Sequence, residues 1–239
     1  MDYFQFAGQS SETFYMIPLQ TDAAAFPVHG FRFSGNPGGY GEVCRDEGLQ
    51  EQMVRLKCAV LSPQGEAQLR TRMRSAAAWL QGEGELVLPQ DGGLAREAWV
   101  SSVGNLVSKK TWGEVEVTFR CHPLLLGEWQ EIALNETCVV GGTAPVRGIL
   151  RTVLPDTDQT SVVFQYGSET LTIYGTTAAG SVIEADTSTG RVTVDGEPAN
   201  SRVPMHSRFF AVDAGNALIS VQSEEGTLSG TFRFRQRWY

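Results

Sequence analysis

Three histidines, the residue type best suited to acid–base catalysis near neutral pH, are scattered along this sequence of 239 residues. They are His29, His122 and His206. None stands in an HExxH pair, and none is flanked by a recognisable nucleophile motif. His122 precedes a proline at the end of an expected strand, and His206 precedes another expected strand. We therefore interpret all three as turn or surface residues and predict no catalytic residue.

Acidic residues are numerous, but their spacing matches no site. Asp156–Thr160 begins like a calcium-binding loop, yet it lacks the glycine at the sixth position and the acidic residue at the twelfth. Glu83, Glu85 and Glu128 have no defined carboxylate partner, so glycosidase chemistry has no support. We predict no metal site and no enzymatic activity, and we leave the ligand-binding residues unassigned.

Cysteines and glycines are equally uninformative about cofactors. Four cysteines form no CxxC pair, which disfavours a zinc cluster: Cys44, Cys58, Cys121 and Cys138. Cys58 and Cys121 each continue an apolar alternation, so we expect buried free thiols. The glycine-rich stretch Gly35–Gly41 is followed by no GK[ST] and no helix, which indicates a surface turn rather than a phosphate-binding loop. We predict no cofactor.

Composition excludes two classes of partner. The formal net charge is −8 and the pI about 5.0, which disfavours nucleic-acid binding. No apolar run approaches the roughly 18 residues needed to cross a bilayer. The stretch Met1–Phe6 lacks the basic start and apolar core of a signal peptide. We expect a protein that folds in a cytoplasm, with a hydrophobic content of 41% that is sufficient for a real core.

One amphipathic helix is expected, over residues 64–80. Its apolar side chains recur at spacings of three and four: Leu69, Met73, Ala76, Ala77 and Leu80. Ser62-Pro63 predicts the helix start, and Gly82 predicts its end. Three arginines fall on the predicted solvent side: Arg70, Arg72 and Arg74. We therefore expect Met73→Asp to unfold the domain and Arg72→Asp to be nearly silent.

The rest of the first half predicts antiparallel sheet. Residues 52–61 and 114–121 alternate strictly between apolar and polar, as strands with one buried face do. The expected end of the second strand is His122-Pro123-Leu124. Residues 26–33 contain a proline and a glycine, which indicates an edge or bent segment. Residues 98–100 and 106–108 bracket Gly104-Asn105 and predict a hairpin.

From Val146 onward, short apolar segments recur every eight to twelve residues with turn residues between them. The expected strands are 146–153, 161–166, 169–174, 181–185, 191–194, 208–212, 217–222 and 227–235. Eight strands without a helix predict a jelly-roll β-sandwich. We place a domain boundary near Leu134. The predicted fold is thus mainly β: an antiparallel domain with one docked helix over 1–133, and a galectin-like or jelly-roll sandwich over 134–239.

Several stretches together resemble the distal tail proteins of long-tailed phages, the siphophage tail-component family. They are Phe4–Ser11, Trp79–Leu86, Val115–Pro123, Val182–Asp186, Arg191–Gly196, Phe209–Ile219 and Arg235–Tyr239. The resemblance implies a belt domain that forms a hexameric ring, with a galectin-like domain outside it. It implies a structural hub that joins the tail tube to the baseplate, tail-tip or tail-associated lysin proteins of a virion made in the host cytoplasm. No turn has apparent room for a long inserted receptor-binding arm.

Two other functions stay open at this level. The second domain by itself looks lectin-like, so a carbohydrate-binding module for host-surface recognition is the alternative; Tyr166 and Tyr174 are its candidate aromatic residues. A tail-associated hydrolase is the third possibility, which no motif supports. The alternatives differ in what they bind, so glycan binding and particle mass separate them.

Overall fold

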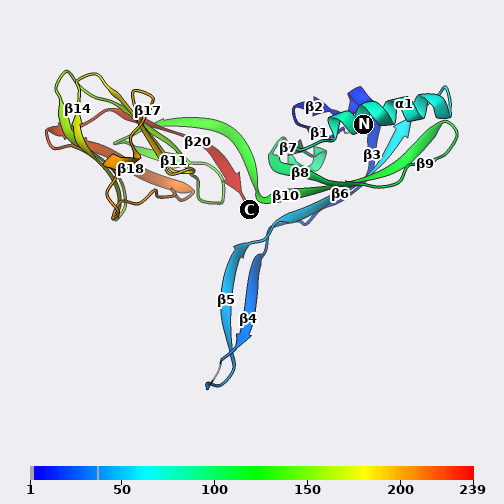
Figure 1. Ribbon diagram of the computed structural model, residues 1–239, viewed down its shortest axis with the longest axis horizontal. Helices are drawn as coiled ribbons and strands as arrows, with labels where there is room; N and C mark the ends of the chain where they lie inside the picture. The colour runs from blue at the N-terminus through cyan, green and yellow to red at the C-terminus, as the bar shows by residue number, and fades with distance from the viewer. Residues whose placement is uncertain (1–2, 37) are drawn as a thin grey trace. The chain divides into compact units, whose positions relative to one another are not determined.

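The computed structural model describes residues 3–36 and 38–239. The chain forms two compact units, Met1–Leu126 with Tyr239, and Gly127–Trp238. Each unit has a hydrophobic core of its own. The predicted fold class, mainly β with one docked helix, is confirmed (Figure 1).

The first unit is built on one antiparallel sheet with the order β3-β6-β10-β8-β7-β1-β2. Its elements are β1 (Gln5–Phe6), β2 (Gln9–Ser10), the 3-10 turn η1 (Ser11–Phe14), β3 (Met16–Asp22), β4 (His29–Gly35), β5 (Glu42–Leu49), β6 (Gln52–Leu61), α1 (Glu66–Trp79), β7 (Glu83–Val87), the 3-10 turn η2 (Pro89–Asp91), β8 (Ala95–Val103), β9 (Val107–Ser108) and β10 (Trp112–Ala133). Strands β4 and β5 stand outside this order and pair only with each other.

The core of the first unit lies between the sheet and α1. Trp79, at the end of the helix, stacks on Phe14 with ring centroids 4.4 Å apart and an interplanar angle of 4°. Its indole Nε1 donates to the Phe6 carbonyl oxygen at 2.9 Å. The apolar alternation predicted for β6 and the first part of β10 is buried on the same side. One tryptophan therefore joins the helix, β1 and η1.

The helix differs from its prediction at both ends and on one side. It begins at Glu66 rather than after Ser62-Pro63, because Ser62–Gly65 forms a turn closed by a hydrogen bond from Gly65 N to Ser62 O at 3.0 Å. Ala77, predicted to be buried, is exposed. Arg72 does not simply face water: its guanidinium carbon lies 3.5 Å from the centroid of the Tyr15 ring, and its Nη1 donates to the Leu61 carbonyl oxygen.

Strand β10 runs through His122-Pro123-Leu124 to Ala133, so the predicted strand end there is wrong. The pairing with β8 shifts register between Cys121 and Leu125. Proline is tolerated in a strand at such an irregularity, because no ladder hydrogen bond is required of it. The 22-residue strand therefore contributes to both compact units.

The hairpin predicted around Gly104-Asn105 is also wrong. Both flanking segments are strands, β8 and β9, but each pairs with β10 and not with the other. Val103 lies opposite Val117 and Val107 opposite Glu114, so the chain keeps its direction along β10 past Gly104-Asn105. The reversal comes after Ser108, where β9 turns into β10.

The second unit is a β-sandwich. Its elements are the later part of β10, β11 (Thr137–Val140), β12 (Gly148–Val153), β13 (Gln159–Tyr166), β14 (Glu169–Thr177), β15 (Val182–Asp186), β16 (Arg191–Val194), β17 (Glu197–Pro198), the 3-10 turn η3 (Asn200–Arg202), β18 (Gly215–Ser223), β19 (Gly226–Thr227) and β20 (Gly230–Trp238). One sheet has the order β17-β16-β15-β12-β20-β10, and the other β11-β18-β13-β14, with β19 beside β18. Apolar residues from both sheets fill one core.

Two predicted strands of this unit are wrong in detail. Residues 208–212 form no strand; Val212 makes only an isolated bridge to Val146. Residues 227–235 divide into β19 and β20, because residues 228–229 leave the strand conformation between them. Phe210 and Val212 are nevertheless buried in the core. The apolar pattern therefore predicted correctly that these residues are buried, but not that they lie outside a strand.

Candidate subunit interface

The first unit carries an exposed hairpin, β4 and β5 with the turn between them, which we call the arm (residues 29–49). Its strands form a two-stranded sheet of their own (Figure 1). Every described residue of the arm from Phe31 to Glu47 is exposed. Phe31 and Phe33 are 55% and 61% exposed. This exposed hairpin was not identified from the sequence, and the expectation that a long receptor-binding arm is absent stays a prediction.

The two faces of the arm differ in chemistry. Phe31 lies opposite Asp46 and Phe33 opposite Cys44, which places both phenylalanine rings on one face. Ser34 lies opposite Val43 on the other face, beside a pair of arginines. Isolated two-stranded hairpins are marginally stable in water, and exposed apolar side chains of this size are common at sites of association. The phenylalanine face is thus a candidate subunit interface.

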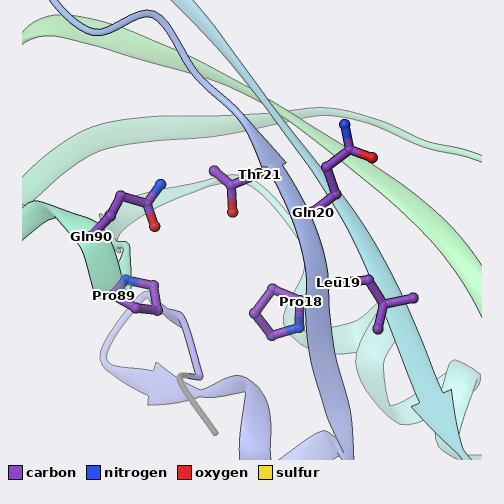
Figure 2. A pocket seen from close by; sticks show the side chains of 6 residues that line it. All are labelled: Pro18, Leu19, Gln20, Thr21, Pro89 and Gln90. Carbon is purple, nitrogen blue, oxygen red and sulfur yellow. The ribbon is translucent and has the colours of Figure 1, made fainter.

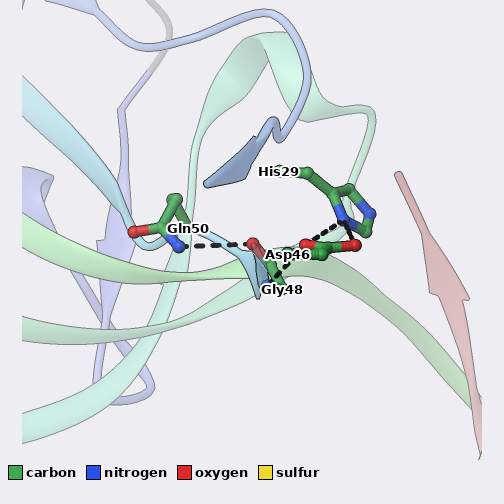
Figure 3. A network of polar contacts seen from close by, with 4 residues as sticks. All are labelled: His29, Asp46, Gly48 and Gln50. Atoms are coloured by element: carbon green, nitrogen blue, oxygen red, sulfur yellow. Dashed lines mark hydrogen bonds and ion pairs between the residues drawn. The ribbon is translucent and has the colours of Figure 1, made fainter. Parts of the chain in front are cut away.

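A network of hydrogen bonds links the two strands at the base of the arm (Figure 3). Nδ1 of His29 lies 3.0 Å from each carboxylate oxygen of Asp46. The Gly48 N–H donates to Asp46 Oδ1 at 2.8 Å, and Gln50 Nε2 donates to the Gly48 carbonyl oxygen at 3.2 Å. The Gly48 hydrogen bond and the His29 side chain lower the pKa of Asp46 below its usual value. Gly48 adopts a φ of +82°, a left-handed conformation that suits glycine beside the β-bulge.

The chain leaving the arm is held to the sheet by polar contacts of Gln52 and Glu51, and the arginine that contacts Gln52 belongs to a buried ion pair. The Arg96 guanidinium binds the Asp91 carboxylate through two hydrogen bonds, Nε to Oδ2 at 2.9 Å and Nη2 to Oδ1 at 3.1 Å. Its Nη1 donates to Oε1 of Gln52, the first residue of β6, at 2.6 Å. Glu51, next to it, pairs with Arg120. These contacts fix where the arm returns to the sheet.

A shallow pocket lies beside β3, the outer strand of the sheet. It is lined by Pro18, Leu19, Gln20, Thr21, Pro89 and Gln90 (Figure 2). The pairing of β3 with β6 shifts register between Pro18 and Gln20, and the intervening Leu19 is exposed. A proline and a bulge in an outer strand are features that limit uncontrolled pairing with other chains.

The three histidines lie on different elements of the described chain. His29 belongs to the arm, His122 to β10, and His206 lies on an exposed loop after η3. Within the described residues, no group of three or more His, Cys, Asp or Glu side chains could hold a metal ion. The side chains of Thr157 and Thr160 donate to Glu225 and Glu224 at 2.9 and 2.8 Å, so the loop that resembles a calcium site is a polar turn. No helix among the described residues is long and apolar enough to span a bilayer.

The two tyrosines considered for sugar binding differ in environment. Tyr174, in β14, is half exposed. Tyr166, at the end of β13, is partly buried, and its hydroxyl accepts from the Asp213 N–H at 3.3 Å. A shallow pocket at this end of β13 is lined by Gln165, Tyr166, Gly167, Asn216, Ala217, Leu218 and Ser220.

The sequence predicts a bent segment and a surface turn within the arm, but it does not predict the hairpin as a whole. Residues 26–33 were predicted as an edge segment and Gly35–Gly41 as a surface turn. The available signal was the pairing of two strand-like segments, 29–35 and 42–49, around that glycine-rich turn. The second segment is rich in charged residues and lacks the apolar–polar alternation that predicts half-buried strands elsewhere in the chain.

Comparison with known proteins gives a family match for part of the second unit and a similar fold for the whole chain. Residues 141–238 match the family model described as the siphovirus-type tail component, C-terminal domain. No curated protein sequence matches the chain. The crystal structure of the Dit protein (gp 19.1) of phage SPP1, described as a paradigm of the hub adsorption apparatus of phages that infect Gram-positive bacteria, has a TM-score of 0.84 at 13% identity, with 100% of each chain covered.

Two structures of the phage P2 baseplate in its activated conformation are also similar. The one with Ca has a TM-score of 0.51 at 9% identity over 98% of this chain and 97% of the other. The one with Sr has a TM-score of 0.50 at 8% identity over 99% and 98%. Residues 141–238 are therefore similar to a siphovirus-type tail component C-terminal domain, and the fold of the whole chain is similar to that of SPP1 Dit.

Proposed function

We propose that this chain is the structural hub subunit of a long-tailed phage or prophage tail, and that it forms a hexameric ring joining the tail tube to baseplate or tip proteins. The observation that carries the proposal is the similarity in fold to SPP1 Dit over the full length of both chains, together with the tail-component match of residues 141–238. In this proposal the protein has a structural role and is not an enzyme.

The arm supports an assembly built by the first unit. A closed ring uses two different surfaces on each subunit, so every copy must both offer and receive a contact. The arm offers apolar side chains and open strand edges, features that a partner chain commonly covers. A stable contact of this kind buries more than about 1,000 Å² in total. We propose that the first part of the chain, predicted as residues 1–133, forms the ring and that residues 134–239 lie at its periphery.

The test is assembly with the neighbouring tail proteins. The chain, co-expressed with its tail tube and tip proteins, is expected to form a six-fold ring at the distal end of the tube in electron micrographs. Replacement of residues 29–49 by a short Gly-Ser turn should leave both units folded, because the arm makes no contribution to either core, but should prevent ring formation. A full-length chain found elsewhere than in such a ring contradicts the proposal.

Carbohydrate binding is the alternative. Its structural basis is the pocket at the end of β13, where amide and hydroxyl side chains lie beside exposed Leu218. Binding of a defined glycan that is lost in Gln165→Ala and Asn216→Ala, by a chain that forms no ring with tail proteins, would favour this function over the hub.

A further inference from the structure

Two pairs of like charges face each other across strands of the first unit. On the arm, Arg32 lies directly opposite Arg45. On the main sheet, Glu85 of β7 lies directly opposite Glu97 of β8. Directly opposite residues have Cβ atoms about 5 Å apart, so like charges at such positions destabilise their own ladder. All four side chains are exposed, so each pair is accessible to a pair of opposite charge on another chain.

The glutamate pair lies in a shallow groove. The groove is lined by Glu83, Gly84, Glu85, Glu97, Ala98 and Trp99. Oε2 of Glu83 accepts a hydrogen bond from Trp99 Nε1 at 3.0 Å, which holds the indole at the groove while 40% of the residue stays exposed. An indole face beside carboxylates is a surface on which a planar guanidinium stacks favourably. The groove thus combines the charge and the aromatic surface that select arginine.

The arginine pair can exchange its present contacts for contacts with another chain. Nε of Arg32 lies 3.1 Å from Glu47 Oε1, but the two side chains are 73% and 40% exposed, and exposed ion pairs contribute only about 0–1 kcal/mol. Within the described residues, neither Arg45 nor Glu97 takes part in an ion pair. The arginine face is opposite the face that carries Phe31 and Phe33, so the arm can make two different contacts.

We propose that the Arg32–Arg45 pair of one copy docks in the Glu85–Glu97 groove of a second copy, with a guanidinium against Trp99; this rests on the proposed ring and names the contact that closes it. A second copy is the occupant because cross-strand geometry sets the same spacing in both pairs, so two arginines meet two glutamates in register. The contact is heterologous, since the arm of each copy occupies the groove of the next.

Charge reversal tests the contact without weakening the fold. Arg45→Glu and Glu97→Arg each remove a like-charge neighbour from their own ladder, so each variant should melt at or above the wild-type temperature. Each should nevertheless lose the six-fold ring in co-expression with the tube and tip proteins. Arg74→Glu, on the exposed side of α1, is the matched control and should assemble normally.

Two rescues identify the partner. The double variant should restore the ring, because each altered arm then meets an altered groove. An equal mixture of the two single variants should also restore it, because copies that alternate around an even-numbered ring pair every altered surface with its complement. Rescue by the double variant but not by the mixture places the contact within one chain and overturns the proposal.

Different results bear on the docking contact and on the hub function. A ring that persists in either single reversal overturns the docking contact and leaves the hub function standing. Failure of the double variant to restore the ring likewise overturns the contact. Absence of a ring in the wild-type co-expression contradicts the hub function itself, together with the contact that rests on it.

Discussion

At the scale of single residues, the buried charge of Arg96 is the one whose removal should affect the first unit strongly. Its side chain and that of Asp91 are only 6% and 9% exposed, and a buried ion pair that loses one partner leaves an uncompensated charge. Arg96→Met should therefore lower the free energy of unfolding by about 3–5 kcal/mol. Urea denaturation measures this.

Arg70→Met is the control for that prediction. It breaks only the exposed pair with Glu66, at four residues' spacing on α1, and should cost no more than about 0.5 kcal/mol. Equal denaturation midpoints for the two variants would show that Arg96 and Asp91 are solvated in solution.

The four cysteines should react in a fixed order with a thiol reagent such as a maleimide. Cys44, on the arm, is exposed. Burial raises the pKa of both Cys58 and Cys121 to about 12, and because the thiolate is the reactive form, neither should react at pH 8 before unfolding. Burial also raises the pKa of Cys138, which should react slowly. Mass spectrometry of labelled peptides follows the order; rapid labelling of a Cys44→Ser variant would contradict it.

At the scale of elements, substitutions in α1 test which of its side chains stabilise the core of the first unit. Met73 packs partly buried against that core, so Met73→Asp should cost several kcal/mol by burying a carboxylate. Arg72→Asp, expected from the sequence to be silent, should cost on the order of 1–2 kcal/mol, because it removes the stacking on Tyr15 and the bond to Leu61.

Arg74→Asp provides the silent comparison on the same helix, since Arg74 is exposed; it should change stability by less than about 0.5 kcal/mol. Thermal melting of the three variants should rank them Met73, Arg72 and Arg74 in order of decreasing effect. A loss at Arg74 equal to that at Met73 would mean that the helix docks through a different face.

At the scale of the whole molecule, β10 decides where the chain divides. Ile132 packs against the second core, and Arg235 Nε donates to the Gly127 carbonyl oxygen at 2.9 Å. A fragment of residues 127–239 should therefore melt at a higher temperature than one of residues 134–239, which lacks both contacts. Equal melting would favour the boundary predicted near Leu134.

Ring formation by fragments belongs to the same scale. We expect residues 1–133 alone to join a ring with the tube and tip proteins, and residues 134–239 alone to stay monomeric. Mass photometry of the second fragment and micrographs of the first measure this. A ring formed by residues 134–239 would reverse the proposed roles of the two parts.

The sequence by itself determined most of the buried side chains of α1, β6 and the start of β10, although Ala77 is exposed. The period of two in β6 and the start of β10, and the spacing of Leu69 and Ala76 in α1, report on solvent exposure within a few neighbouring residues. For the same reason, the mainly β fold class and the single long helix could be predicted.

Only the tertiary structure decided which segments pair and which residues meet. β8 and β9 both join β10, Pro123 lies within a strand, and Arg72 stacks on Tyr15. The arm and the groove at Trp99 depend on cross-strand register, which places residues from different strands side by side. A local pattern specifies the face that a residue presents, whereas its neighbours depend on contacts between segments far apart in the chain.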